Sequence, residues 1–206
     1  MMRRPGGADF APGAWVFPGG SVGPEDADQP DGVRAAGLRE VWEEMGLLLA
    51  WSRAGGRRRF ATTADAARVR RAVESGLDFW PALEELGLEP ALERLVPLTR
   101  WITPLGVRRR FDTRFYVVRA PRQEVVPAPG EVSGWRWVTA AEALAAGDGQ
   151  LVYATRRILE LVCPVPDATS LLRRLRGRAE RQPVQPRIVE GSGRPTVVDD
   201  ATPLFR

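Results

Sequence analysis

The stretch WVFPGG (residues 15–20), followed further on by REVWEEMGL (residues 39–47), decides how this chain folds. Asp31 is expected to cap a helix that begins just after it, because an aspartate accepts hydrogen bonds from the free amides of a first turn. Gly46 is expected to end the helix, because glycine tolerates the left-handed backbone of a helix stop. The segment between them therefore predicts a helix of roughly four turns.

Three glutamates of this helix share one face. At about 100° per residue, Glu40, Glu43 and Glu44 fall at relative angles of about 0°, −60° and 40°. The face expected to be buried carries Leu38, Val41 and Met45. Clustered carboxylate oxygens suit Mg²⁺ or Mn²⁺, which would neutralise the repulsion between them. The alternative is a solvated helix face, the usual meaning of glutamates at this spacing beside an apolar stripe.

The turn ahead of the helix favours the metal site over the solvated face. Phe-Pro-Gly-Gly follows a short β-rich run, and two consecutive glycines leave the backbone bare enough to approach a metal or a phosphate.

Composition limits the chemistry that the chain can perform. Its 206 residues, 44% of them hydrophobic, can bury one main core with appendages. The sequence contains neither Lys nor His. A Ser-His-Asp triad, a Cys-His pair and a His-ligated zinc are therefore excluded, and a general base must be a carboxylate or a metal-bound hydroxide. The single cysteine, Cys163, excludes a disulfide within the chain, and we expect a buried thiol.

The sequence contains no apolar run long enough to span a bilayer and no apolar signal core at its start. A cytoplasmic protein without a membrane partner is therefore expected. The formal net charge of +4 is too small to predict a nucleic-acid partner.

Residue patterns predict strands and helices in a mixed order. Strands are expected at residues 47–51, 95–103, 111–119 and 135–138, and helices at 64–74, 79–86, 140–146, 155–162 and 168–178. The fold class is α/β, with a main domain over residues 1–165, a helical insert at about 61–94, and a basic helix with a loosely held tail over 166–206. Met2-Arg3-Arg4 reads as the end of a strand, so N-terminal strands of the sheet are expected to be truncated.

The two quoted segments resemble the signature box of the Nudix hydrolases, enzymes that cleave a nucleoside diphosphate linked to another group. Residues 39–47 match the family pattern at every fixed position. The loop after Gly20 is longer than the family's, and Asp31 stands eight residues before Arg39, where the family has a glutamate. The resemblance implies an α/β/α sandwich with a mixed sheet and a divalent-metal cofactor, Mg²⁺ or Mn²⁺.

A second resemblance concerns the branch of the family. Residues 101–104 and 110–116, with Glu131 ahead of 135–138, resemble the peroxisomal coenzyme A diphosphatases, although the C-terminal end is no peroxisomal address. This resemblance implies water attack on the diphosphate bridge of coenzyme A or an acyl-CoA. The alternatives are an ADP-ribose or NADH pyrophosphatase, and a catalytically silent module that binds a nucleotide or RNA.

Roles for the box residues follow from the resemblance. Glu43 and Glu44 are expected to be metal ligands, and Glu40 a third ligand or the group that orients and deprotonates water. Arg39 should hold Glu40 in place through a charge-assisted hydrogen bond. The carbonyl of Gly20 is a further candidate ligand.

Residues downstream of the box offer candidates for substrate binding. Glu131 is either an assisting glutamate or an exposed turn residue. Arg110 and Asp112 could position the substrate, although strand alternation would leave them solvated. Arg57 and Arg59 could bind the extra phosphate of coenzyme A, although basic runs are usually solvated loops. The expected partner is a small-molecule nucleotide, and a homodimer is a further possibility. Trp101, Trp135 and Trp137 are expected in the core.

Overall fold

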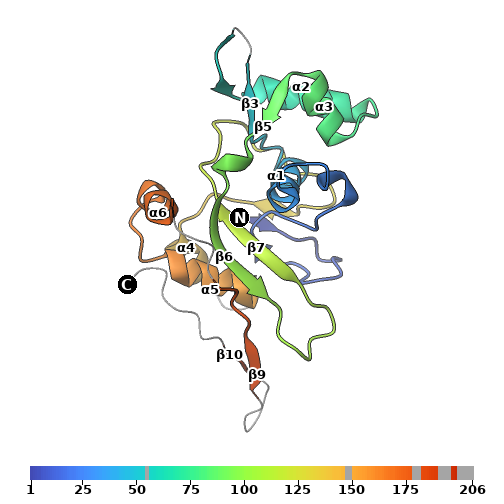
Figure 1. The fold of residues 1–206 in the computed structure, drawn as a ribbon. Coiled ribbons are helices and arrows are strands. Elements are labelled where there is room, and N and C mark those ends of the chain that lie inside the picture. The colour runs from blue at the N-terminus through green and yellow to red at the C-terminus, as the bar shows by residue number, and fades with distance from the viewer. Residues whose placement is uncertain (54–55, 147–149, 178–181, 190–195, 199–206) are drawn as a thin grey trace.

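A computed structural model describes residues 1–53, 56–146, 150–177, 182–189 and 196–198. The expected α/β class is confirmed. Helix α1 (Gly32–Met45) lies between the helices of the insert and the hairpin formed by β6 (Val96–Ile102) and β7 (Asp112–Val117), as Figure 1 shows. The described part of the chain thus places the box helix at the junction of its two halves.

The strands form several small antiparallel sheets instead of the expected single mixed sheet. One has the order β2 (Trp15–Val16), β1 (Met2–Arg3), β8 (Gly134–Trp135), and another the order β4 (Arg59–Phe60), β3 (Ala50–Ser52), β5 (Leu88–Pro90). The remaining pairs are β6 with β7 and β9 (Arg187–Val189) with β10 (Thr196–Val198). Most strands have only two or three residues. Among the described residues, parallel pairing is confined to isolated bridges.

Both predicted caps of α1 are confirmed. The Asp31 carboxylate accepts a hydrogen bond of 3.1 Å from the amide of Arg34. Gly46 takes a left-handed φ of 69° at the C-terminal end. The predicted apolar face is largely confirmed too, because Leu38 and Met45 are buried and Val41 is half-buried.

The predicted insert consists of α2 (Thr63–Glu74) and α3 (Phe79–Glu85), which pack against α1. Thr62 and Asp65 cap α2 reciprocally. The indole of Trp42, on α1, stacks on the ring of Phe79 with their centroids 4.8 Å apart. The main apolar core therefore joins the insert to the box helix.

The other half of the molecule has its own core. Strand β6 packs with α5 (Tyr153–Val162) and α6 (Ala168–Leu175), burying Trp101 as expected. Helix α4 (Ala140–Ala145) lies beside α5. Helix α6 ends earlier than expected, and Arg178 lies outside the described residues. In the described part of the chain, every helix is too short or too polar to cross a membrane.

Some sequence expectations were wrong. Trp135 and Trp137 are 39% and 65% exposed, because short β8 ends at Trp135 and gives the second indole no strand to pack in. The thiol of Cys163 is exposed, because it caps the end of α5. The predicted strand at 47–51 begins only at Ala50.

Of the tail expected to be loosely held, the structure describes residues 182–189 and 196–198. The amide of Val184 donates to the carbonyl of Arg100 at 2.8 Å, and the amide of Ile102 donates to the carbonyl of Val184 at 2.9 Å. These bonds fix Val184 along the free edge of β6.

We predict that Gly46→Ala lowers the free energy of unfolding by about 2 kcal/mol or more, because a side chain at positive φ costs about 1–2 kcal/mol. Its Cβ would also lie 2.9 Å from both the Cβ and the carbonyl oxygen of Val126. Urea denaturation measures the loss. Gly37→Ala in the same helix is the matched control, because its Cβ meets only Leu95 at 3.7 Å. It should leave stability unchanged or raise it by about 0.5–1 kcal/mol, and equal losses in both variants would contradict the argument.

Candidate functional site: a carboxylate cluster around Arg39

Arg39 lies at the centre of the candidate site. Its side chain, on the third turn of α1, is only 8% exposed. Nη1 donates to Glu40 Oε1 at 3.1 Å and to Glu43 Oε2 at 2.7 Å. The expected bond between Arg39 and Glu40 is therefore confirmed, and Glu43 shares the same donor.

The other side of the Arg39 guanidinium faces the loop before the helix. Asp26, at the end of the 3₁₀ helix η1 (Pro24–Asp26), is completely buried. Its carboxylate accepts from Arg39 Nε at 3.1 Å and from Nη2 at 3.0 Å. The carbonyl of Ser21 accepts a further bond from Nη2, and Glu25 forms an ion pair at 3.4 Å. One guanidinium thus joins the loop to the helix.

Asp26 is the residue of this network that the sequence reasoning missed. Counting back from Arg39 places Asp31 at the family's glutamate position. In the structure, however, Asp31 caps α1 and forms an ion pair with Arg34. Asp26 instead contacts Arg39. Counting forward from Gly20 would have found it, because the extra residues of the loop lie between Asp26 and the helix.

The insert also reaches this site. The indole Nε1 of Trp80, in α3, donates to Asp26 Oδ1 at 3.2 Å. The amide of Gly23 donates to the other oxygen of Asp26 at 2.9 Å. Burial alone would raise the pKa of Asp26, but the bonds from Arg39, Gly23 and Trp80 outweigh it and lower that pKa. The aspartate is therefore ionised in its buried position.

The two glycines of the turn lie against the glutamates. The amide of Gly19 donates to Glu44 Oε2 at 2.7 Å. A Cβ added to Gly20 would lie 2.3–2.5 Å from the carboxyl group of Glu40, so only glycine fits there without displacing that side chain. The bare backbone of the turn, predicted to approach a metal or a phosphate, thus lies against the carboxylates of the helix.

The carboxylates of the site raise one another's pKa values. The pKa of Glu44 rises to about 7, and burial is the largest cause of this rise. The charges of Glu40 and Glu131 add to it, whereas the hydrogen bond from Gly19 opposes it. Burial likewise raises the pKa values of Glu40 and Glu43 despite the nearby Arg39. The charge of Glu131, an exposed turn residue, contributes to the rise at all three positions. Negative charge therefore exceeds positive charge here.

The donor chemistry of this cluster fits a hard divalent cation. Carboxylate oxygens are the ligands that Mg²⁺ and Mn²⁺ prefer, and a cation would relieve the mutual repulsion that, after burial, adds to the rise of the pKa values. Within the described residues, however, no three acidic or cysteine side chains gather closely enough to hold a metal ion as they stand. Arg39 occupies oxygens of both Glu40 and Glu43, so a bound cation has to share these two carboxylates with the guanidinium.

The predicted substrate-binding residues do not gather around this cluster. Asp112 forms a bidentate ion pair with Arg100, and Arg110 donates to the carbonyl of Thr103. Arg59 pairs with Asp65 at 2.8 Å, next to the cap of α2. Figure 1 shows the β3–β5 sheet and the turn between β6 and β7 towards opposite ends of the molecule. The two predicted sets therefore cannot contact one small ligand together.

The fold and the acidic helix are those expected of a Nudix-type protein, and comparison with known proteins supports this class. A crystal structure of a NUDIX hydrolase from Alicyclobacillus acidocaldarius superimposes with a TM-score of 0.67 and 28% sequence identity, covering 82% of this chain and 84% of that one. The fold is thus the Nudix fold.

A particular relative points in the same direction. Over 145 residues the chain is 29% identical to a Caenorhabditis elegans protein named as a candidate nudix hydrolase, number 7 of its series. The match covers 70% of this chain and 47% of the relative, so the chain spans about half the relative's length. No protein-family model matches the chain. Both similarities support a Nudix-type hydrolase.

We predict that Glu44→Gln stabilises the metal-free protein at high pH. The folded-state pKa of about 7 exceeds the ordinary value of 4.5, so the folded protein holds this proton more tightly than the unfolded chain. The stabilising contribution is complete below pH 4.5 and is lost as the pH rises towards 7. Between pH 5 and 8 the variant should gain about 1–3 kcal/mol relative to the parent chain.

Denaturant unfolding in EDTA at both pH values measures this gain. Glu74→Gln, at the exposed end of α2, is the control and should track the parent chain. A Glu44→Gln variant whose stability falls with pH as steeply as that of the parent would contradict the assignment.

Proposed function

We propose that the chain is a Mg²⁺- or Mn²⁺-dependent hydrolase of a nucleoside diphosphate linked to another group, with coenzyme A or an acyl-CoA as the preferred substrate. The observation that supports it best is the cluster around Arg39. There, Gly19 and Gly20 contact Glu44 and Glu40, and Arg39 holds Glu40 and Glu43 in one orientation. The Nudix-type relatives support the same reaction class.

Each residue of the cluster has a distinct role in this proposal. Glu40, Glu43 and Glu44 would hold the divalent ion, with the Gly20 carbonyl as a further candidate ligand. When bound, the ion neutralises phosphate charge and lowers the pKa of water. Arg39 keeps Glu40 and Glu43 oriented, and the raised pKa of Glu40 makes it a stronger base than an ordinary glutamate. Glu131 assists from the rim through its charge.

Nucleophilic side chains have no part in this proposal. Phosphoryl chemistry with water as nucleophile depends mainly on positioning and charge neutralisation, so an acidic helix and a cation are sufficient. The exposed Cys163 lies at the end of α5, outside the hydrogen-bonded network of the cluster.

We predict that Glu43→Gln lowers hydrolysis of coenzyme A, ADP-ribose and NADH by at least about 100-fold, the scale of losing a group that acts on the reacting water or its charge. Phosphate-bond cleavage by the purified chain with Mg²⁺ or Mn²⁺ measures it, and Glu74→Gln should keep full activity. Full activity in Glu43→Gln would contradict the proposal. If the parent chain binds these nucleotides without cleaving them, whatever residue stands at 43, the silent binding module is the better description.

Arg57 tests the substrate proposal. Its side chain is exposed and forms no ion pair within the described residues, whereas Arg59 is held by Asp65. We predict that Arg57→Gln lowers kcat/KM for coenzyme A about tenfold, the scale of one charge-assisted phosphate contact, and leaves ADP-ribose unaffected. Arg71→Gln, at an exposed position of α2, is the control. Equal losses on both substrates would contradict a coenzyme A phosphate clamp.

A further inference from the structure

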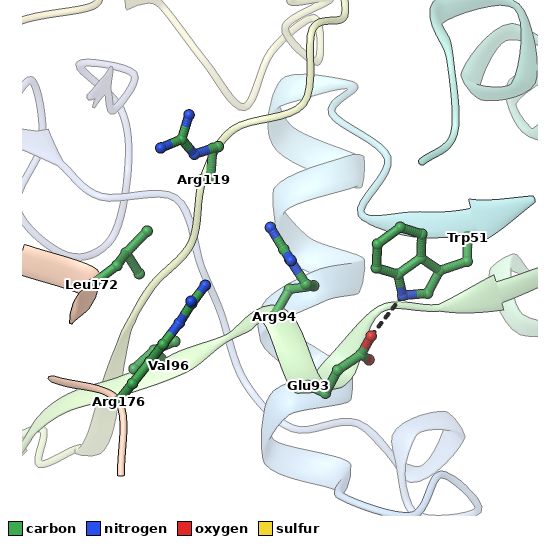
Figure 2. Close-up of a pocket in the computed structure, with 7 residues that line it drawn as sticks. All are labelled: Trp51, Glu93, Arg94, Val96, Arg119, Leu172 and Arg176. Atoms are coloured by element: carbon green, nitrogen blue, oxygen red, sulfur yellow. Dashed lines mark hydrogen bonds between the residues drawn. The ribbon is translucent and has the colours of Figure 1, made fainter. Parts of the chain in front are cut away.

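A cavity of about 400 Å³ lies outside the carboxylate cluster. It is bounded by β3, by the 3₁₀ helix η3 (Leu92–Arg94), by β6, by the chain after β7, and by α6. Its lining residues, shown in Figure 2, are Trp51, Glu93, Arg94, Val96, Arg119, Leu172 and Arg176. None of them belongs to the network around Arg39, so the cavity is a separate feature of the molecule.

The wall of this cavity is strongly positive. Figure 2 shows Arg94, Arg119 and Arg176 arranged around one opening. In the described part of the chain, none of these three guanidinium groups forms an ion pair, and Arg119 donates to a neutral partner, Thr169 Oγ1, at 2.9 Å. The three arginines belong to three separate segments of the chain. Folding therefore brings their charges together, although they are not neighbours in the sequence.

The single acid of the wall is already engaged. Glu93 Oε1 accepts from Trp51 Nε1 at 2.6 Å and pairs with Arg58 at 3.5 Å. The ion pair with Arg58 therefore offsets much of the negative charge of Glu93 at the cavity wall. The lining carries three cations against this one anion, and no ion pair neutralises the surplus positive charge within the described residues.

The aromatic residue of the wall is also occupied. The guanidinium of Arg58 lies 4.6 Å from the centroid of the Trp51 ring, and Phe60 packs edge-on at 4.8 Å. Arg94 approaches the same ring at 5.8 Å. A ligand base would have to displace these neighbours in order to stack on the indole. Recognition here therefore depends on charge and hydrogen bonding rather than on an aromatic platform.

We propose that this cavity is a binding site for a phosphate-bearing small molecule, held through a diphosphate group by Arg94, Arg119 and Arg176. Guanidinium groups match phosphate oxygens in pairs of hydrogen bonds, which makes arginine the preferred partner of such anions. A volume of about 400 Å³ falls within the usual range for small-molecule sites. The proposal is independent of hydrolysis at the carboxylate cluster.

The test measures binding of inorganic pyrophosphate to the full chain by isothermal titration calorimetry. EDTA removes divalent ions, so that the carboxylate cluster repels the probe. The parent chain should bind one equivalent saturably, and inorganic phosphate, with one phosphoryl group fewer, should bind at least tenfold more weakly. The double variant Arg94→Gln/Arg176→Gln should bind pyrophosphate at least tenfold more weakly than the parent.

Two further variants keep the result interpretable. Arg173→Gln/Arg71→Gln removes the same charge from exposed positions outside the cavity and should bind like the parent. Glu93→Gln removes the one negative charge of the wall and should tighten binding several-fold, a gain that misfolding cannot produce. Equal weakening in both double variants, the absence of saturable binding in the parent, or weaker binding by Glu93→Gln would overturn the proposal.

Discussion

The structure of the site depends on one shared guanidinium. Arg39 is nearly buried, and its donors bond carboxylates of the preceding loop on one side and of its own helix on the other. Burial opposes its charge, but the bonds to Asp26 and the charges of Glu43 and Glu40 raise its pKa above the ordinary value. Removing one member of such a buried network leaves its partners charged and unpaired, which typically costs 3–5 kcal/mol. The loop and the helix are therefore held as one unit.

The surrounding architecture serves this arrangement. Gly20 leaves space for the Glu40 carboxylate, and Gly46 stops the helix directly after Glu44 and Met45. A later segment of the chain also holds the end of this helix, because the amides of Val126 and Ala128 donate to the carbonyls of Met45 and Glu44. Backbone therefore encloses the C-terminal end of the helix, and the glycine turn packs against the carboxylates of Glu40 and Glu44.

Local signals in the sequence predicted the elements well. The caps of α1, its buried face and the two insert helices each follow from residues that are neighbours in the chain, such as Asp31 before the helix and Gly46 after it. The contact between Arg39 and Glu40 follows for the same reason.

Contacts between residues far apart in the chain could not be predicted from such local signals. Asp26 accepts from Trp80 across 54 residues of separation, and neither residue belongs to a pattern that indicates the other. The Gly20 turn was predicted to approach a metal or phosphate, but its fit against Glu40 required the coordinates. The exposed faces of Trp137 and Cys163 were missed because burial depends on which elements cover a side chain, and hydrophobic character alone does not determine this.

The Trp80 bond has a consequence for how the chain can be dissected. An insert of two helices on a separate sheet has the appearance of a detachable module, one that could be excised to give a minimal domain. Here its removal would withdraw an indole donor from a fully buried carboxylate and uncover Trp42 on the box helix. The insert is therefore integral to the box, and the two have to be inherited, grafted or redesigned together.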